Sequence, residues 1–264
     1  MGYTNPIPKL SQRPNEVPQK GNKYASQIIE DYREYSHIYF AFMDVLGFKQ
    51  AFDENRDAPS AKFAKEYADV FRYYSQLIAS SKFASTDPSY AGQTSDTLYY
   101  YTDRIDYLAE FVKVYLHFSL YAMSKNVFFR GGIANGCLFT RAPHQFYGNC
   151  VIRAYLLEER ISKYPRVALD KVTYENLSKT LDLADAFYCD STNGRFYLNP
   201  FVKILENELA AITNLEPSYF QKISKKDVLT NIKRGAVRFE FDEHNYPKYQ
   251  FLLRAFEESS KVFE

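Results

Sequence analysis

The sequence predicts an α/β fold in which helices cover a β-sheet. Two kinds of segment alternate along its first two thirds. Short runs rich in Val, Phe and Tyr are typical of strands, and longer stretches with apolar residues every three or four positions are typical of amphipathic helices. With 264 residues and 46% hydrophobic residues, the chain can bury one substantial core. We therefore expect one core domain with an appended extension.

The element order is strand, helix, hairpin, helix, strand, followed by a further helix and a short strand. Residues 37–43 are continuously apolar and aromatic, which predicts a central strand covered on both faces. Asn126 is expected to end the second helix. The predicted elements are a strand at 37–43, a helix at 63–78, a hairpin at 91–101, a helix at 108–116, a strand at 127–129, a turn at 130–132, a helix at 150–163 and a strand at 167–169.

The two ends of the chain differ from this core. Residues 1–24 carry four prolines among polar residues, a composition that predicts a flexible N-terminal arm. Residues 25–170 hold the predicted core domain. Residues 171–264 alternate between helical and strand-like pieces, and we expect them to form a mixed extension that packs on the core.

Bulk composition excludes several classes of partner. The net charge is +1, from 33 basic and 32 acidic residues, so no broad basic surface for nucleic acid or an anionic membrane is expected. No apolar run approaches the roughly 18 residues that a membrane helix needs, and the start has no signal-peptide core. Three cysteines without a CxxC pair favour a reducing compartment, so we expect a cytoplasmic protein.

Two acidic residues stand where predicted strands end. Asp44 ends the central strand in FMDVLGF, and Asp96 lies in the hairpin turn in TSDTLYYY. Two carboxylates on neighbouring strands can bind a pair of hard divalent cations, which keep coordination positions open for phosphates. Gly47 would let the backbone after Asp44 approach a triphosphate without interference from a side chain. The alternative is that Asp44 caps the next helix and Asp96 only makes a turn.

Four blocks in order resemble the class III adenylyl and guanylyl cyclase family over residues 36–170. They are IYFAFMDVLGFKQ, TSDTLYYY, FFRGGIANGCLF and QFYGNCVIRAYLLEERI. The resemblance implies a class III cyclase-type α/β sandwich, a ferredoxin-like palm core with a C-terminal mixed extension. It also implies an enzyme that closes a nucleoside triphosphate into its 3′,5′-cyclic monophosphate and releases pyrophosphate.

The same resemblance assigns roles to individual residues. Asp44, Asp96 and the backbone of Val45 are expected to hold two divalent cations, Mn²⁺ or Mg²⁺. Val45, Leu46, Gly47 and Phe48 are expected to bind the substrate phosphates. In the family each active site straddles a head-to-tail homodimer, so the implied partner is a second copy of this chain.

The departures from the family concern base recognition and the transition state. Two positions that read a purine base in the family hold Gly92 and Gln145 here, so neither purine-reading pair is present. The family's transition-state Asn and Arg are replaced by Ile152 and Leu156. Arg153 on the same predicted helix is our candidate to stabilise the developing charge in their place, acting from the partner subunit together with Gln145.

Arg130 and Arg166 are weaker candidates for this role, because an Arg at a strand edge is more often a rim charge, and Arg166 is also expected to bind the substrate. Tyr164-Pro165-Arg166, together with 24 Tyr and no Trp, looks like the bacterial pyrimidine cyclases of the Pycsar anti-phage system. That implies UTP as the favoured substrate and a cUMP messenger that acts on a separate effector. The alternatives are CTP with cCMP as product, a catalytically silent nucleotide-binding dimer, and a structural interaction module.

Overall fold

The computed structural model describes residues 33–48, 61–84, 86–142, 145–183, 185–190, 193–243 and 245–259. It is a mixed α/β structure on one eight-stranded, mainly antiparallel sheet with the order β2-β3-β1-β4-β6-β8-β7, and β5 pairs with β4 beside this path. The arm predicted at residues 1–24 lies outside the described residues. No helix in the described ranges is long and apolar enough to cross a membrane.

The elements follow the predicted alternation. The strands are β1 (Arg33–Val45), β2 (Tyr90–Thr94), β3 (Thr97–Thr102), β4 (Phe129–Ala142), β5 (Gln145–Tyr147), β6 (Val167–Leu169), β7 (Phe187–Asp190) and β8 (Arg195–Leu198). The helices are α3 (Ala61–Ser80), α4 (Ile105–Ser124), α5 (Asn149–Leu156), α6 (Lys171–Thr180), α7 (Glu206–Ile212), α8 (Lys225–Arg238) and α9 (Tyr246–Ser259), with a π-helical turn at Leu157–Ile161 and a 3-10 turn at Pro217–Tyr219.

The first half of the sheet is the predicted palm core. Its elements run β1-α3-β2-β3-α4-β4, and its strands lie in the order β2-β3-β1-β4 with every neighbouring pair antiparallel. This is the ferredoxin-like arrangement of two interleaved β-α-β units. The predicted α/β sandwich is therefore confirmed.

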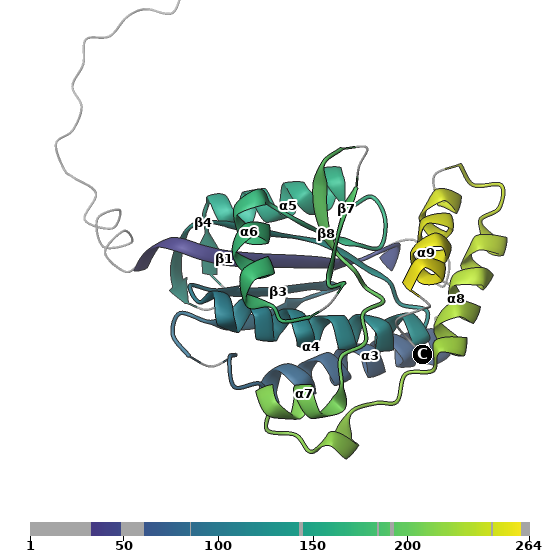
Figure 1. Cartoon of the computed structure of the whole chain (residues 1–264), viewed down its shortest axis with the longest axis horizontal. Helices are drawn as coiled ribbons and strands as arrows, with labels where there is room; N and C mark the ends of the chain where they lie inside the picture. Colours follow the sequence, from purple (N-terminus) through teal and green to yellow (C-terminus); the bar gives the residue numbers. More distant parts are fainter. Residues whose placement is uncertain are drawn as a thin grey trace, which may run out of the picture.

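From Ile38 to Met43, β1 is covered on both faces, as predicted from its continuous apolar run, whereas its first five residues are not buried. Tyr39 and Met43 pack into the core formed with α3 and α4, whereas Ile38 and Phe40 pack into a second core with α5. Figure 1 shows α5 on one side of the sheet and α3 and α4 on the other. Successive residues of a strand point to opposite faces, so a strand covered twice needs apolar residues at every position.

The turn predicted at residues 130–132 is wrong, because these residues belong to β4. A Cβ on Gly131 would lie 2.4 Å from the carbonyl oxygen of Phe42 in β1, and one on Gly132 would lie 2.3 Å from that of Ala154 in α5. The two glycines therefore permit close backbone approach within a strand and do not mark a turn.

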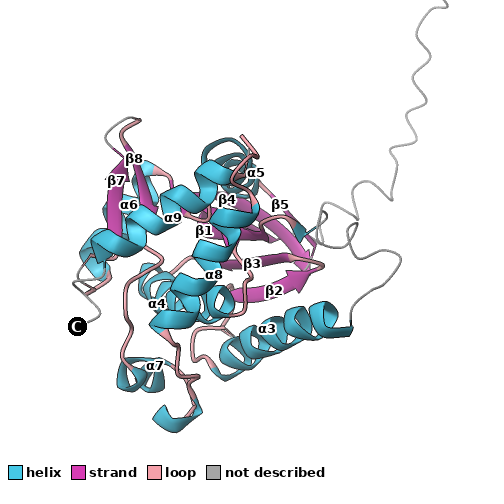
Figure 2. Cartoon of the chain, turned by 90° about the vertical axis from the view of Figure 1, so that its right-hand side faces the viewer, coloured by secondary structure: helices cyan, strands magenta, loops and turns pink. Residues whose placement is uncertain are grey.

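Residues after β6 extend the same sheet and add a helical hairpin. Strand β8 pairs with β6, with Val167 opposite Leu198, and β7 forms the edge. Helices α8 and α9 lie side by side at the end of the sheet where β1 finishes (Figures 1 and 2). Their apolar residues, with Met123 of α4 and Phe128 ahead of β4, form a third core against which Leu46 packs. A boundary at residue 170 stays a prediction.

Candidate active site at the end of the central strand

Asp44 is the penultimate residue of β1, at the centre of the sheet. In register it stands opposite Thr97 of β3 on one side and Arg130 of β4 on the other. The hydroxyl of Thr97 donates a hydrogen bond to Asp44 Oδ1 at 3.2 Å, and Arg130 Nη2 lies 3.9 Å from Asp44 Oδ2. Both neighbouring strands therefore help to orient this carboxylate.

Asp96 lies in the two-residue turn between β2 and β3, as the sequence predicts. Ser95, the other turn residue, has a positive φ of 55°, a conformation common in tight hairpin turns. The turn places Asp96 directly before Thr97, the register partner of Asp44. The two carboxylates are close enough that the charge of Asp96 raises the pKa of Asp44. The structure thus brings the two predicted acids together.

The surroundings of Asp44 disfavour its ionised form. Burial first, and then the neighbouring charge of Asp96, raise the pKa of Asp44 from 3.8 to about 6. Arg130 and the hydroxyl of Thr97 oppose this shift without cancelling it. An ionised carboxylate that is partly desolvated beside a second acid is stabilised by a bound cation.

Glu158 belongs to the same charged cluster, although the sequence analysis did not select it. Its carboxylate is buried, and its Oε1 lies 2.6 Å from Arg130 Nε in an ion pair. Burial is the main reason that the pKa of Glu158 rises to about 7, and Asp44 adds to the shift. Glu158 lies in the π-helical turn Leu157–Ile161, which continues α5. The sequence pattern does not predict that Glu158 is buried, because a π turn shifts side chains away from the positions that α-helical periodicity predicts.

Lys248 of α9 brings a further buried cation towards this region. Its ammonium donates to Asn245 Oδ1 at 2.9 Å, and only 7% of the residue is exposed. Burial lowers the pKa of Lys248, and the positive charge of Arg130 lowers it further. The C-terminal extension therefore contributes to the electrostatics around Arg130, which composition alone did not indicate.

The loop after Asp44 is only partly as expected. Gly47 has a positive φ of 76°, and a Cβ there would meet no atom of the described residues within 4 Å, so these residues leave the backbone open at this point. The amide of Leu46, however, donates to the carbonyl of Phe128 at 2.8 Å. The amide of Leu46 is therefore not available to donate to a phosphate. Phe48 packs its ring 5.4 Å from that of Tyr67 on α3, and Val45 is buried.

The two positions aligned with purine recognition lie near one aromatic cluster. A Cβ on Gly92 would fall 2.4 Å from the ring of Tyr99, which therefore occupies the space beside it. Gln145 is exposed at the start of β5. The next residue, Phe146, places its ring 5.0 Å from Tyr99. Neither position offers a charged side chain.

The candidate arginines lie in different surroundings. Arg153 is exposed on α5 and donates from Nη1 to the carbonyl of Asn135 at 3.3 Å. Arg166 is buried, stacks 3.8 Å from the ring centre of Tyr197 and lies 3.4 Å from Asp190. Arg166 is thus held by partners in β7 and β8, and its substrate contact stays a prediction, as does the role of Arg153.

A metal at this site would depend on few protein ligands. Within the described ranges, no group of three or more His, Cys, Asp and Glu side chains is arranged to hold an ion. Asp44 and Asp96 supply two carboxylates, and the carbonyl of Val45 is the backbone oxygen that follows. Such a sparse, all-oxygen set fits Mg²⁺ or Mn²⁺, which complete their shells with water and phosphate oxygens.

Comparison with known proteins gives structural similarity and no match in sequence. No protein-family model matches the chain, and no curated protein sequence matches it. The fold is similar to the monomeric guanylyl cyclase domain of the RhoGC fusion protein from the aquatic fungus Blastocladiella emersonii, with 12% identity, a TM-score of 0.45, and 63% of this chain and 96% of that chain covered.

Two further cyclase structures show a similarity of the same size. For a bacterial light-regulated adenylyl cyclase the identity is 13%, the TM-score 0.44 and the coverage 75% of this chain and 67% of that chain. For the guanylyl cyclase Cya2 the values are 12%, 0.39, 63% and 91%. Similarities at this level do not establish an activity, which depends on the residues of the site.

Proposed function

We propose that this chain is a metal-dependent nucleotidyl cyclase that converts a pyrimidine nucleoside triphosphate, preferentially UTP, into its 3′,5′-cyclic monophosphate and pyrophosphate. The observation that carries the proposal is the meeting of Asp44 and Asp96 at the end of β1, beside the open backbone of Gly47. A carboxylate pair next to an accessible glycine loop can serve a metal-bound triphosphate.

Asp44, Asp96 and the carbonyl of Val45 would hold two Mn²⁺ or Mg²⁺ ions. When bound, these ions neutralise the triphosphate and favour ionisation of the ribose 3′-hydroxyl, the nucleophile that displaces pyrophosphate from the α-phosphorus. The chain itself contributes orientation, because Thr97 and Arg130 fix the carboxylate of Asp44 from both sides. The pair formed by Arg130 and Glu158 adds a positive and a negative charge beside Asp44.

The raised pKa of Asp44 supports a cation-binding role for the two acids over the alternative of a helix cap and a simple turn. A capping carboxylate accepts backbone hydrogen bonds that stabilise its charged form, which lowers its pKa. The pKa of Asp44 is raised instead, mainly by burial.

A pyrimidine base is favoured by the surroundings of Gly92. The ring of Tyr99 fills the space into which a longer side chain at position 92 would project, so no charged group reads a base there. Aromatic walls narrow a site and stack on a single ring. Gln145 carries both donors and an acceptor, which suits the edge of uracil or of cytosine. Uracil over cytosine, the cUMP messenger, its separate effector and its use in anti-phage defence are proposed from the family resemblance.

A head-to-tail homodimer is the proposed active form. Tyr147 of β5 and Ile152 and Tyr155 of α5 are 54%, 61% and 45% exposed, which is unusual for large apolar side chains grouped on neighbouring elements. Arg153 lies between Ile152 and Tyr155 in the sequence and is also exposed. Pairing of this surface with a second subunit would bring Arg153 and Gln145 to the carboxylates of the other protomer.

The direct test is incubation of the purified protein with each of the four nucleoside triphosphates and Mn²⁺, with products resolved by chromatography. Asp44→Asn and Asp96→Asn should each abolish cyclisation, and Asp182→Asn, at an exposed acid, should leave it intact. A cyclic purine nucleotide formed with a higher kcat/KM than either pyrimidine product would refute the base assignment. Undiminished turnover by either site variant would refute the metal assignment.

The dimer is tested by mixing two inactive variants. Asp44→Ala and Arg153→Ala subunits, once exchanged, should form hybrid dimers with one intact site and regain part of the activity. No recovery after confirmed exchange would remove Arg153 from the composite site. The alternative of a catalytically silent dimer is favoured by Ile152 and Leu156 at the family's transition-state positions. It predicts that UTP and Mn²⁺ raise the melting temperature although no product forms.

A further inference from the structure

A cavity of the molecule lies away from the carboxylate pair. Its volume is about 500 Å³, and it is lined by α4, the segments that lead into α7 and α8, and the C-terminal part of α9. None of its lining residues belongs to β1, β3 or β4. Binding sites for small molecules usually measure about 300–1,000 Å³, so this cavity has room for a ligand.

The walls of the cavity combine an apolar floor with a cationic rim. Leu120, Ile204 and Val228 are buried members of the floor. Among the described residues of the lining, three are lysines, Lys203, Lys222 and Lys225, and one is an acid, Glu206. An apolar surface surrounded by excess positive charge is complementary to a molecule with an apolar body and an anionic group.

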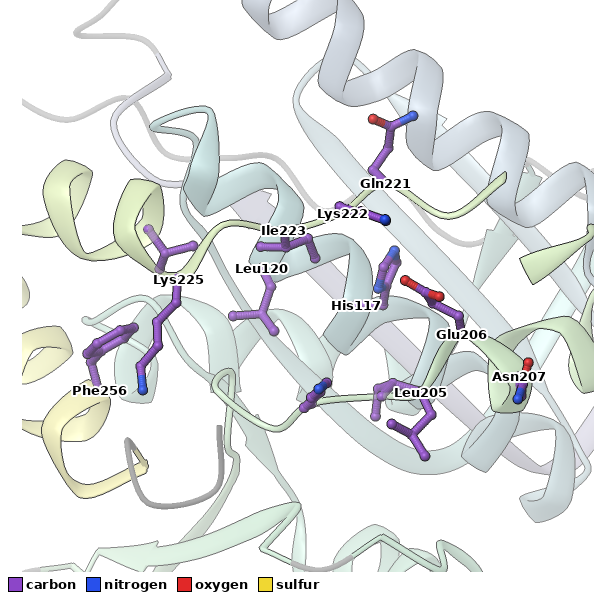
Figure 3. Close-up of a pocket in the computed structure, with 13 residues that line it drawn as sticks. His117, Leu120, Leu205, Glu206, Asn207, Gln221, Lys222, Ile223, Lys225 and Phe256 are labelled. Atoms are coloured by element: carbon purple, nitrogen blue, oxygen red, sulfur yellow. The ribbon is translucent and has the colours of Figure 1, made fainter. Parts of the chain in front are cut away.

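The rim cations lie on more than one side of the hollow. Figure 3 shows Lys222 near His117 and Glu206 on one side and Lys225 beside Phe256 on the other. The ammonium of Lys225 lies 5.8 Å from the ring centre of Phe256. A lysine that stacks on an aromatic ring keeps its charge near the apolar floor.

The wall formed by α4 is fixed in place by hydrogen bonds. Nε2 of His117 lies 2.8 Å from the hydroxyl oxygen of Tyr73, and this oxygen also accepts the backbone N–H of Gln221 at 3.1 Å. Burial lowers the pKa of His117 to about 4, so its ring is neutral near pH 7. His117 therefore adds a neutral, oriented polar group, and the positive charge of the cavity comes from its lysines.

We propose that this cavity binds a small amphipathic anion, that is, a molecule with one carboxylate, sulfonate or phosphate group on a body of up to three rings. The lysines would contact the anionic group, and the apolar body would lie on Leu120, Ile204 and Val228. The proposal does not depend on the cyclase activity. A metal ion is a poor fit, because Glu206 is the only acid among the described residues that line the cavity.

The test uses two fluorescent probes with the same aromatic body. 8-Anilinonaphthalene-1-sulfonate carries the anionic group, and N-phenyl-1-naphthylamine lacks it. The native protein should bind the sulfonate with an affinity at least tenfold higher than that of the neutral probe. The double variant Lys203→Gln/Lys222→Gln should lose this tenfold preference, whereas Lys179→Gln/Lys233→Gln, which removes two exposed lysines outside the cavity, should keep it.

Two further variants locate the bound probe. Asn207→Trp, at an exposed lining position, should weaken binding of both probes because the indole would occupy the cavity. Asp44→Asn should leave both affinities unchanged, because the carboxylate pair lies elsewhere. Equal affinities for the two probes, or a sulfonate preference that survives the double lysine variant, would overturn the proposal. Melting curves establish that each variant is folded.

Discussion

Replacement of Asp44 by Asn should stabilise the metal-free protein while it abolishes the proposed activity. The pKa of Asp44 is raised from 3.8 to about 6 by burial and by the charge of Asp96. A carboxyl whose pKa is higher in the folded than in the unfolded state destabilises the fold once it ionises. The penalty is absent below pH 3.8, grows between pH 3.8 and 6, and is complete above pH 6.

The size of the effect follows from the shift. About two pKa units correspond to about 3 kcal/mol at pH 8. The Asn side chain keeps an oxygen that can accept from Thr97 and carries no charge to desolvate. We therefore expect Asp44→Asn to raise the free energy of unfolding by about 1–3 kcal/mol at pH 8. The gain should vanish near pH 4.

Urea unfolding at pH 8 and pH 4 in the presence of a chelator measures this gain. Asp182→Asn is the matched control at an exposed acid and should change stability by less than about 0.5 kcal/mol. Titration with Mn²⁺ completes the test, because it should stabilise the native protein and leave Asp44→Asn unchanged. If Asp44→Asn is less stable than the native protein at pH 8 without metal, ionised Asp44 does not destabilise the fold and the explanation is refuted.

Three further predictions follow from other buried groups. The native protein should lose about 2 kcal/mol of stability between pH 6.5 and pH 4.5, because the pKa of His117 is about 4 in the folded state and 6.5 in the unfolded state. His117→Gln should not show this loss. Urea titrations at the two pH values measure it. Gly132→Ala should cost at least about 2 kcal/mol, since its Cβ would meet the backbone of α5. Gly194→Ala, at a position with positive φ where no atom of the described residues lies within 4 Å, should cost only about 1 kcal/mol. Equal losses would contradict the close-approach argument. Glu158→Gln should weaken stabilisation by Mn²⁺ in melting experiments, because Arg130, without its buried partner, would compete with Mn²⁺ for the carboxylate of Asp44. An unchanged rise in melting temperature with Mn²⁺ would show that this pair does not influence the metal site.

The sequence predicts the palm core well where local pattern and tertiary role agree. The continuous apolar run of β1, the spacing of the two long helices and the turn at Asp96 are each visible within a few residues of chain. The prediction fails at Gly131 and Gly132, where glycine serves contacts with β1 and α5 that are distant in the sequence. Local turn chemistry cannot distinguish a glycine needed for φ from one needed for space.

The sequence predicts only those residues of the candidate site that lie at the end of a recognisable strand or in the turn between two strands. Asp44 and Asp96 can be found because each ends or connects a recognisable strand. Glu158 and Lys248 could not be found, because one depends on a π turn and the other on how α9 docks against the core. Burial, which decides both of their pKa shifts, is a property of the assembled fold and not of a sequence window.

The C-terminal hairpin has a physical link to the proposed phosphate loop. Leu46, between the carboxylate of Asp44 and Gly47, packs against the core that α8 and α9 form with α4. Its amide is also tied to Phe128, whose ring contacts Tyr249 of α9 at 5.6 Å. The position of the loop therefore depends on the hairpin as well as on β1. That hairpin also supplies walls of the cationic cavity. An anion bound in the cavity would therefore contact α8 and α9, the two helices that support the loop after Asp44.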